Sequence, residues 1–171
     1  MTPVDAPLVL TLALDKPSFQ FFNRLRQAHF PAERNFLEAH LSLFHHLPGT
    51  EAPCIADHLA QVCRAQPPLT LPVTEVKMIG KGVAYVVKNK ALVAWREQLA
   101  HHWQAWLTPQ DRQKLWPHIT VQNKVTPAEA RALQQQLAQD FAPFQAQGTG
   151  VCLWAYRNGP WEWLHDFGFE G

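Results

Sequence analysis

Two short segments of the sequence share one pattern, in which a histidine and a hydroxyl residue alternate with apolar residues. They are His40-Leu41-Ser42-Leu43 and His118-Ile119-Thr120-Val121. This alternation is typical of a β-strand with one buried face, because successive side chains point to opposite sides of a sheet. Each segment therefore predicts a strand that presents its histidine and its hydroxyl on one face and its aliphatic residues to the core.

Strand and helix patterns alternate along the whole chain, and their order occurs twice. In each half the order is strand, helix, strand, helix, strand, and the histidine segment is the second strand. Thr126-Pro127-Ala128-Glu129 is a capping box with proline at the first helical position. Predicted strands cover residues 6–14, 39–44, 69–76, 82–87, 118–121 and 148–156, with an edge strand at 161–167; the helices between them begin near Pro17, Pro48, Asn89 and Thr126, and the third runs to Thr108.

This order predicts an α/β (α+β) fold made of two pseudo-symmetric lobes. Each lobe is expected to be a small, mainly antiparallel sheet with helices outside, and the lobes form a central groove. The repeat covers about residues 8–76 and 82–157 of a single bilobal domain, residues 1–171, and no linker separates the halves. A hydrophobic fraction of 47% excludes a disordered chain.

The charged residues and cysteines narrow the possible partners. The formal net charge is +1, so no global field draws the protein to nucleic acid or membrane, and any polyanion must be bound locally. Three cysteines without a CxxC pair predict free thiols in apolar surroundings, as expected in the cytoplasm. The apolar stretch at residues 6–14 is too short for a membrane span and has no basic residues before it, which favours a buried strand and no membrane partner.

The histidine segments point to acid–base chemistry on a small anion. If the two halves are related by an approximate two-fold axis, two imidazoles and two hydroxyls surround one such anion. An imidazole serves as base or as acid near neutral pH, so two of them can remove one proton and supply another. The hydroxyls of Ser42 and Thr120 would donate hydrogen bonds to the anion as its charge increases.

The paired H-L-S-L and H-I-T-V segments resemble the signature of the two-histidine (2H) phosphoesterase superfamily, especially its bacterial RNA 2′,3′-cyclic phosphodiesterase or 2′-5′ RNA ligase-like branch. The resemblance extends to the first strand, to the spacing of the segments and to the strand at residues 80–85. It implies a bilobal fold and hydrolysis of cyclic phosphodiesters at RNA ends or in small nucleotides, with no metal and no cofactor. It also implies that His40, Ser42, His118 and Thr120 are catalytic, in a protein that we expect to be a monomer.

The near-symmetry of the segments leaves the order of acid and base open, although the resemblance favours His118 as base and His40 as acid. Ser42 stands where threonine is commoner, so the hydroxyl is kept but the β-branch that stiffens χ1 is lost. In the reverse direction, 2′-5′ RNA ligation, the two roles would exchange.

The strand at residues 148–156 offers further candidates for substrate binding. Trp154 and Tyr156 share one face of it, where they could stack a nucleobase, although aromatic stripes also pack in cores. Arg157 follows and could reach a phosphate or lie in solvent. The basic residues between Glu75 and Glu97 could attract RNA or form a solvated face; they are Lys77, Lys81, Lys88, Lys90 and Arg96.

Two other function classes remain open. One is a binding module that holds RNA ends or a phosphorylated metabolite in the same groove without turnover. The other is a metal-dependent hydrolase, suggested by the adjacent pairs His45-His46 and His101-His102. Neighbouring side chains diverge in both strands and helices, so neither pair is a natural chelate, and we read them as surface or partly packed histidines.

Overall fold

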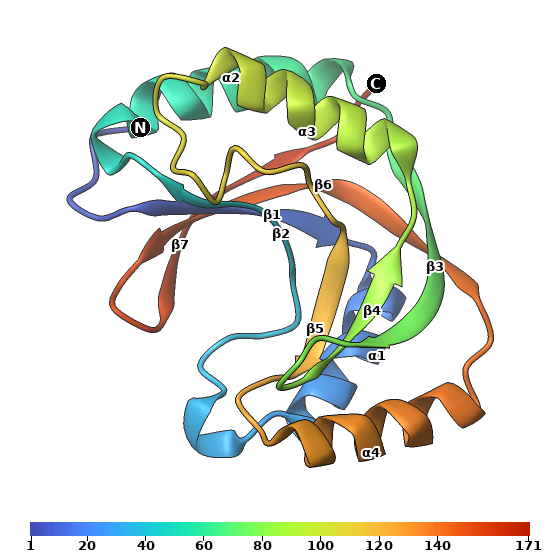
Figure 1. Cartoon of the computed structure of the whole chain (residues 1–171). Coiled ribbons are helices and arrows are strands. Elements are labelled where there is room, and N and C mark those ends of the chain that lie inside the picture. The colour runs from blue at the N-terminus through green and yellow to red at the C-terminus, as the bar shows by residue number, and fades with distance from the viewer.

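Seven strands form one antiparallel sheet, which bends so strongly that its two edge strands approach each other (Figure 1). The structure is a computed structural model that describes all 171 residues. The strand order is β2-β1-β6-β3-β4-β5, and β7 pairs with β6. The strands are β1 (Leu8–Leu14), β2 (Leu41–Leu47), β3 (Leu69–Met78), β4 (Val83–Val87), β5 (His118–Gln122), β6 (Phe144–Tyr156) and β7 (Trp161–Gly168).

Strand β6 joins the two halves of the sheet. Its first part, residues 144–148, pairs with β3, and residues 148–155 pair with β1, so Gly148 is paired on both sides, with Leu69 and Leu14. The strand begins four residues before its predicted start at Gly148. The antiparallel α+β class is confirmed, and all strands belong to one continuous sheet. That the halves are two related lobes stays a prediction.

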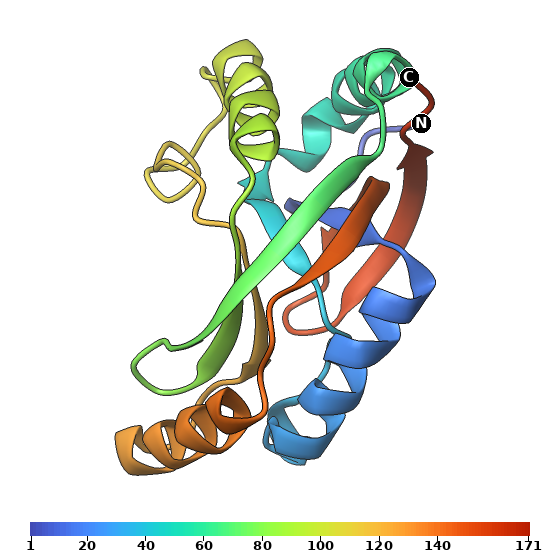
Figure 2. The same cartoon turned by 90° about the vertical axis from the view of Figure 1, so that its right-hand side faces the viewer.

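Four helices cover the sheet: α1 (Lys16–His29), α2 (Ala52–Ala65), α3 (Lys90–His102) and α4 (Pro127–Gln139). Helices α2 and α3 lie at one end of the molecule, and α1 and α4 lie at the other (Figure 2). Helix α1 packs against β5, and α4 packs against β3 and β4. Each part of the sheet thus has a helix between its aliphatic face and solvent.

Local signals in the sequence explain where two of these helices begin. Asn89 accepts a hydrogen bond from the backbone N–H of Leu92 at 2.7 Å, and Thr126 and Glu129 form the predicted capping box. Helix α3 ends at His102, six residues before the predicted end at Thr108. Trp103 turns its almost fully buried side chain onto Phe44, with ring centroids 5.2 Å apart, and this tertiary contact ends the helix.

The core is built from the alternating aliphatic residues that the strand pattern predicted. Leu41, Leu43, Ile119 and Val121 are at most 1% exposed, and the aliphatic face of β6 is equally buried. The opposite faces of the same strands therefore carry the residues that are free to form a site.

The three cysteines are free thiols. Burial raises the pKa of Cys63 and of Cys152 to about 12, which suits the predicted apolar surroundings. For Cys54 the prediction is wrong: its side chain is exposed in the first turn of α2, where only part of the helix faces the sheet.

No helix combines the length and the hydrophobicity that a bilayer-spanning segment needs.

Candidate active site

The two histidine segments lie at the two edges of the bent sheet. His40 immediately precedes β2, and His118 is the first residue of β5. These edge strands are in contact although four other strands lie between them in the sheet. His40 and Thr120 line the same cavity. The structure therefore brings the two segments together.

The two imidazoles are held in the same way. Nδ1 of His40 lies 2.7 Å from the carbonyl oxygen of Glu38, and Nδ1 of His118 lies 2.7 Å from that of Trp116. A carbonyl only accepts, so each Nδ1 carries the proton, and Nε2 of the neutral ring is left as an acceptor. Both rings are thus in the tautomer that can take a proton at Nε2 and, once charged, return it.

Each of these rings also packs against a tryptophan. The centroids of His40 and Trp161 are 4.7 Å apart, and those of His118 and Trp116 are 4.3 Å apart with the rings nearly parallel. The indole faces limit how the imidazoles can rotate, and they favour a charged imidazole by a cation–π contact. Sequence reasoning missed Trp116 as a site residue, although its position two residues before His118 was a signal.

Both histidines have lowered pKa values. Burial lowers the pKa of His40 to about 4, and the positive charges of Arg26, His45 and His118 lower it further. The hydrogen bond to the carbonyl of Glu38 acts in the opposite direction and raises this pKa. Burial likewise lowers the pKa of His118, with a further contribution from the charge of His45. In the free protein both rings are therefore neutral at pH 7.

The two hydroxyl residues take different positions. Thr120 lines the cavity that His40 also lines, whereas Ser42 sits on β2 opposite Thr11 of β1. Arg26 lies under this region: it is 4% exposed, and its Nη1 donates to the carbonyl of Thr120 at 3.1 Å. Nothing in the helical pattern around Arg26 marked it as a residue near the site.

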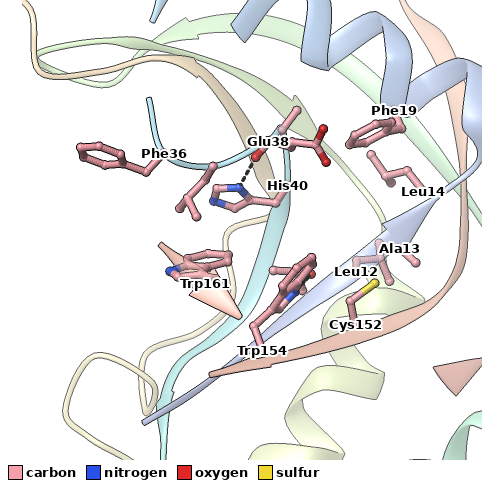
Figure 3. A pocket seen from close by; sticks show the side chains of 13 residues that line it. Leu12, Ala13, Leu14, Phe19, Phe36, Glu38, His40, Cys152, Trp154 and Trp161 are labelled. Carbon is pink, nitrogen blue, oxygen red and sulfur yellow. Dashed lines mark hydrogen bonds between the residues drawn. The ribbon is translucent and has the colours of Figure 1, made fainter. Parts of the chain in front are cut away.

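A cavity of about 400 Å³ opens beside His40, on the face of the sheet that carries Trp154 and Cys152 (Figure 3). Trp154 and Trp161 stand on the side of the cavity next to His40, and Nε1 of Trp154 donates to Thr11 Oγ at 2.9 Å. Most of the lining is apolar, including Phe36. The cavity offers flat apolar surfaces to a ring system.

The other two substrate-binding candidates lie at different places. Tyr156 is 40% exposed and lines a second cavity together with His40 and Thr120. Arg157 instead forms ion pairs with Asp5 at 2.7 Å and Glu162 at 2.6 Å, and it lines neither cavity. The structure does not bring Arg157 to the site.

The remaining histidine pairs do not form a chelating group with other residues. No three or more histidine, cysteine, aspartate or glutamate side chains gather as they would around a metal ion. His45 instead bonds the buried carboxylate of Asp111, a loop residue that sequence reasoning missed. Arg96, counted with the basic run, is 3% exposed and so belongs to the core rather than to a charged surface.

Comparison with known proteins places this geometry in context. The sequence model of the 2′-5′ RNA ligase superfamily matches residues 14–160. No curated protein matches the chain significantly.

Solved structures share the fold at low sequence identity. TT0787 of Thermus thermophilus aligns with a TM-score of 0.68 and 14% identity, over 96% of this chain and 98% of that one. Escherichia coli LigT complexed with 3′-AMP gives a TM-score of 0.63 and 17% identity, over 97% and 99% of the two chains. E. coli LigT complexed with NADP+ gives a TM-score of 0.61 and 19% identity, over 97% of this chain and 99% of that one.

Proposed function

Since the chain belongs to the 2′-5′ RNA ligase superfamily, we propose that it hydrolyses 2′,3′-cyclic phosphodiesters of RNA ends or nucleotides, with His40 and His118 as general acid and base. The observation that supports this most is the matched pair of imidazoles, each with Nδ1 on a backbone carbonyl at 2.7 Å. Two such rings on converging strands suit a reaction that needs one proton removed and another supplied. We also propose that residues 8–76 and 82–157 are related lobes that contribute one histidine each.

In the proposed reaction, one neutral imidazole accepts a proton at Nε2 from water as the water oxygen bonds to phosphorus. The bond from phosphorus to one ribose oxygen breaks on the opposite side, and the second imidazole, protonated, donates its Nε2 proton to that oxygen. The product is a phosphomonoester, and the two histidines have exchanged protonation states. We favour His118 as the base and His40 as the acid, and ligation would run the same steps in reverse.

The hydroxyls of Ser42 and Thr120 would donate hydrogen bonds to the non-bridging oxygens as negative charge increases on them. Charge from the bound anion would also raise the pKa of the neighbouring imidazoles, which burial has lowered, so that one of them is protonated in the complex. The protein's own residues thus account for each proton in the reaction.

The cavity beside His40 suits the base of a nucleotide. Trp154 and Trp161 present flat faces whose centroids are 6.2 Å apart, and stacking on such faces is tolerant of base identity. LigT, which shares the fold, has been solved with 3′-AMP and with NADP+, so adenine nucleotides are the first ligands to test.

The test is hydrolysis of a dinucleotide that ends in a 2′,3′-cyclic phosphate, assayed with EDTA present. His40→Ala and His118→Ala are each expected to remove activity while the far-UV spectrum and the melting temperature show a folded protein. His101→Ala, on the exposed end of α3, is the matched control. Retention of more than about a tenth of the wild-type rate in either variant contradicts the proposal, because acid–base groups contribute 10²–10⁴-fold.

The same assay separates the alternatives. A protein that binds the cyclic dinucleotide but does not turn it over is a binding module, and one that loses activity in EDTA is a metal-dependent enzyme. Incubation with paired RNA ends, followed by analysis of the linkage formed, measures 2′-5′ ligation.

A further inference from the structure

A third histidine, His45, lies on strand β2 with Ser42. Strand β2 is irregular after Ser42: Ser42 pairs with Thr11, but the next partner of β1, Leu10, pairs with Phe44. One extra residue in β2 therefore opposes β1 there, and two consecutive residues, Leu43 and Phe44, are both buried. A second shift follows, because the next pair is Leu8 with Leu47, so His45 and His46 together oppose Val9. Val9 shares a face of β1 with Thr11, the partner of Ser42, and His45 therefore lies on the Ser42 side of β2.

The ring of His45 is held by a carboxylate that is fully buried. Oδ1 of Asp111 lies 3.2 Å from Nδ1 of His45 and also accepts a hydrogen bond from the backbone N–H of His45 at 2.8 Å. Oδ2 of Asp111 accepts a hydrogen bond from the backbone N–H of His46 at 2.8 Å. Burial by itself would raise the pKa of Asp111, but these hydrogen bonds lower it overall, so the group stays ionised. A carboxylate only accepts, so Nδ1 of His45 carries a proton, and Nε2 lies on the side of the ring away from Asp111.

The support beneath this pair is rigid. Arg96 is 3% exposed and donates three hydrogen bonds to backbone carbonyls: those of Leu43 at 3.1 Å, Asp111 at 2.5 Å and Gln113 at 3.2 Å. Its guanidinium also lies over the ring of Phe44 at 4.2 Å. One buried side chain thus fixes the bulge that turns His45 and the loop that carries Asp111.

His45 is near both catalytic candidates. The positive charge of a protonated His45 lowers the pKa of His40 and also that of His118. Asp111 is the charged group bonded to His45, and Arg96 lies behind it on the backbone carbonyl of Asp111. The side chain of His45 is 44% exposed, so a ligand in the groove can reach its free Nε2.

From this geometry we propose that His45, oriented by Asp111, is an anion-binding residue that contacts the phosphate of the substrate between His40 and His118. The identity of the substrate in this proposal rests on the proposed function. The binding of phosphate by His45 does not depend on it. A protonated imidazole beside the reacting phosphate supplies a charge-assisted hydrogen bond. His45 is in this assignment a binding residue and takes no part in proton transfer to or from the ribose oxygen or water.

The first test needs no turnover. Binding of inorganic phosphate near pH 5.5 is followed by NMR titration of the histidine ring protons in wild type, His45→Gln and His46→Gln. His46 is the matched control, because it is the exposed neighbour whose ring makes no hydrogen bond. We expect about a tenfold or greater loss of phosphate affinity in His45→Gln, the effect of one lost charge-assisted hydrogen bond, and little change in His46→Gln.

The second test follows the titration of His40 and His118 in the same variants without ligand. Removal of the positive neighbour should raise both pKa values in His45→Gln only, an effect that a purely structural role would not produce. Unchanged phosphate affinity and unchanged titration in His45→Gln overturn the assignment, even if the protein is an active phosphodiesterase. Lost phosphate affinity in a protein without phosphodiesterase activity supports His45 and refutes the proposed hydrolysis.

Discussion

Nη1 of Arg26 lies 3.1 Å from the carbonyl oxygen of Thr120, so helix α1 is bonded directly to the strand that carries the second histidine. Nε of the same side chain bonds Asn35 Oδ1 at 2.8 Å and the carbonyl of Leu37 at 2.9 Å, in the segment that leads to the first histidine. One buried guanidinium therefore holds the backbone around both motifs, and all of these partners are neutral oxygens.

Replacement of this guanidinium should destabilise the protein. Arg26→Met leaves buried carbonyl groups without donors, so we expect the free energy of unfolding to fall by about 3 kcal/mol, as for several hydrogen bonds to a charged group. Urea denaturation measures this loss. Arg24→Met, an exposed position on the same helix, should change stability by less than about 0.5 kcal/mol. Equal stability of the two variants would show that Arg26 does not connect the motifs.

The rate of hydrolysis should depend on pH in a way that follows from the two lowered pKa values. The acid must be protonated, and burial holds the pKa of both His40 and His118 below the ordinary value of about 6.5. The basic limb of kcat/KM, which reports the free protein, is therefore expected below pH 6.5, with a fall of about tenfold per pH unit above it. The limb for kcat should lie at higher pH, because the bound anion favours the charged ring.

Steady-state kinetics of a cyclic dinucleotide between pH 4.5 and 8.5 would measure both limbs. A value of kcat/KM that stays constant or rises between pH 6.5 and 8 is incompatible with two depressed imidazoles in these roles.

Stability should also depend on pH through His40. Its pKa is about 4 in the folded protein and about 6.5 in the unfolded chain, so between these values the unfolded state binds the extra proton. The free energy of unfolding should therefore fall as the pH drops from about 6.5 to about 4. Above about pH 6.5 the contribution of His40 to this free energy is constant. Urea denaturation at pH 7 and pH 5 should show a smaller difference for His40→Asn than for wild type. Identical differences in the two proteins would mean that His40 titrates normally.

Both hydroxyls should be needed for the full rate of hydrolysis. Ser42→Ala and Thr120→Ala each remove a donor to the phosphate, and we expect kcat to fall by about 10²-fold with smaller effects on KM. Ser42→Thr keeps the hydroxyl and restores the β-branch, so it should retain or raise kcat. If Ser42→Ala has the rate of wild type, Ser42 is only a strand residue.

Local sequence patterns predicted much of this architecture because they depend on few neighbours. Alternating residues identified both motif strands, and the caps at Asn89 and Thr126 are hydrogen bonds within one turn of chain. The aromatic face of β6 followed from the same alternation, and it carries Trp154 into the cavity beside His40.

The features that the sequence did not reveal depend on tertiary contacts. The bulge in β2 lies where Phe44 packs against Trp103 and Arg96, which are more than fifty residues away, and it changes the alternation of faces before His45. Asp111 carried no signal, since an aspartate in a loop is ordinarily solvated. Its burial follows from the fold of the loop over Arg96.

The double pairing of Gly148 has a consequence for which molecules the groove can accept. A Cβ at this position would lie 3.2 Å from Leu12 Cδ2 and 3.4 Å from Leu71 Cδ1, side chains that come from opposite halves of the sheet. Gly148 is therefore the point at which the half of the sheet that ends in β2 is joined to the half that ends in β5. A side chain added there would push against both halves, and we expect it to change which ligands fit between the two histidine segments while both histidines are kept.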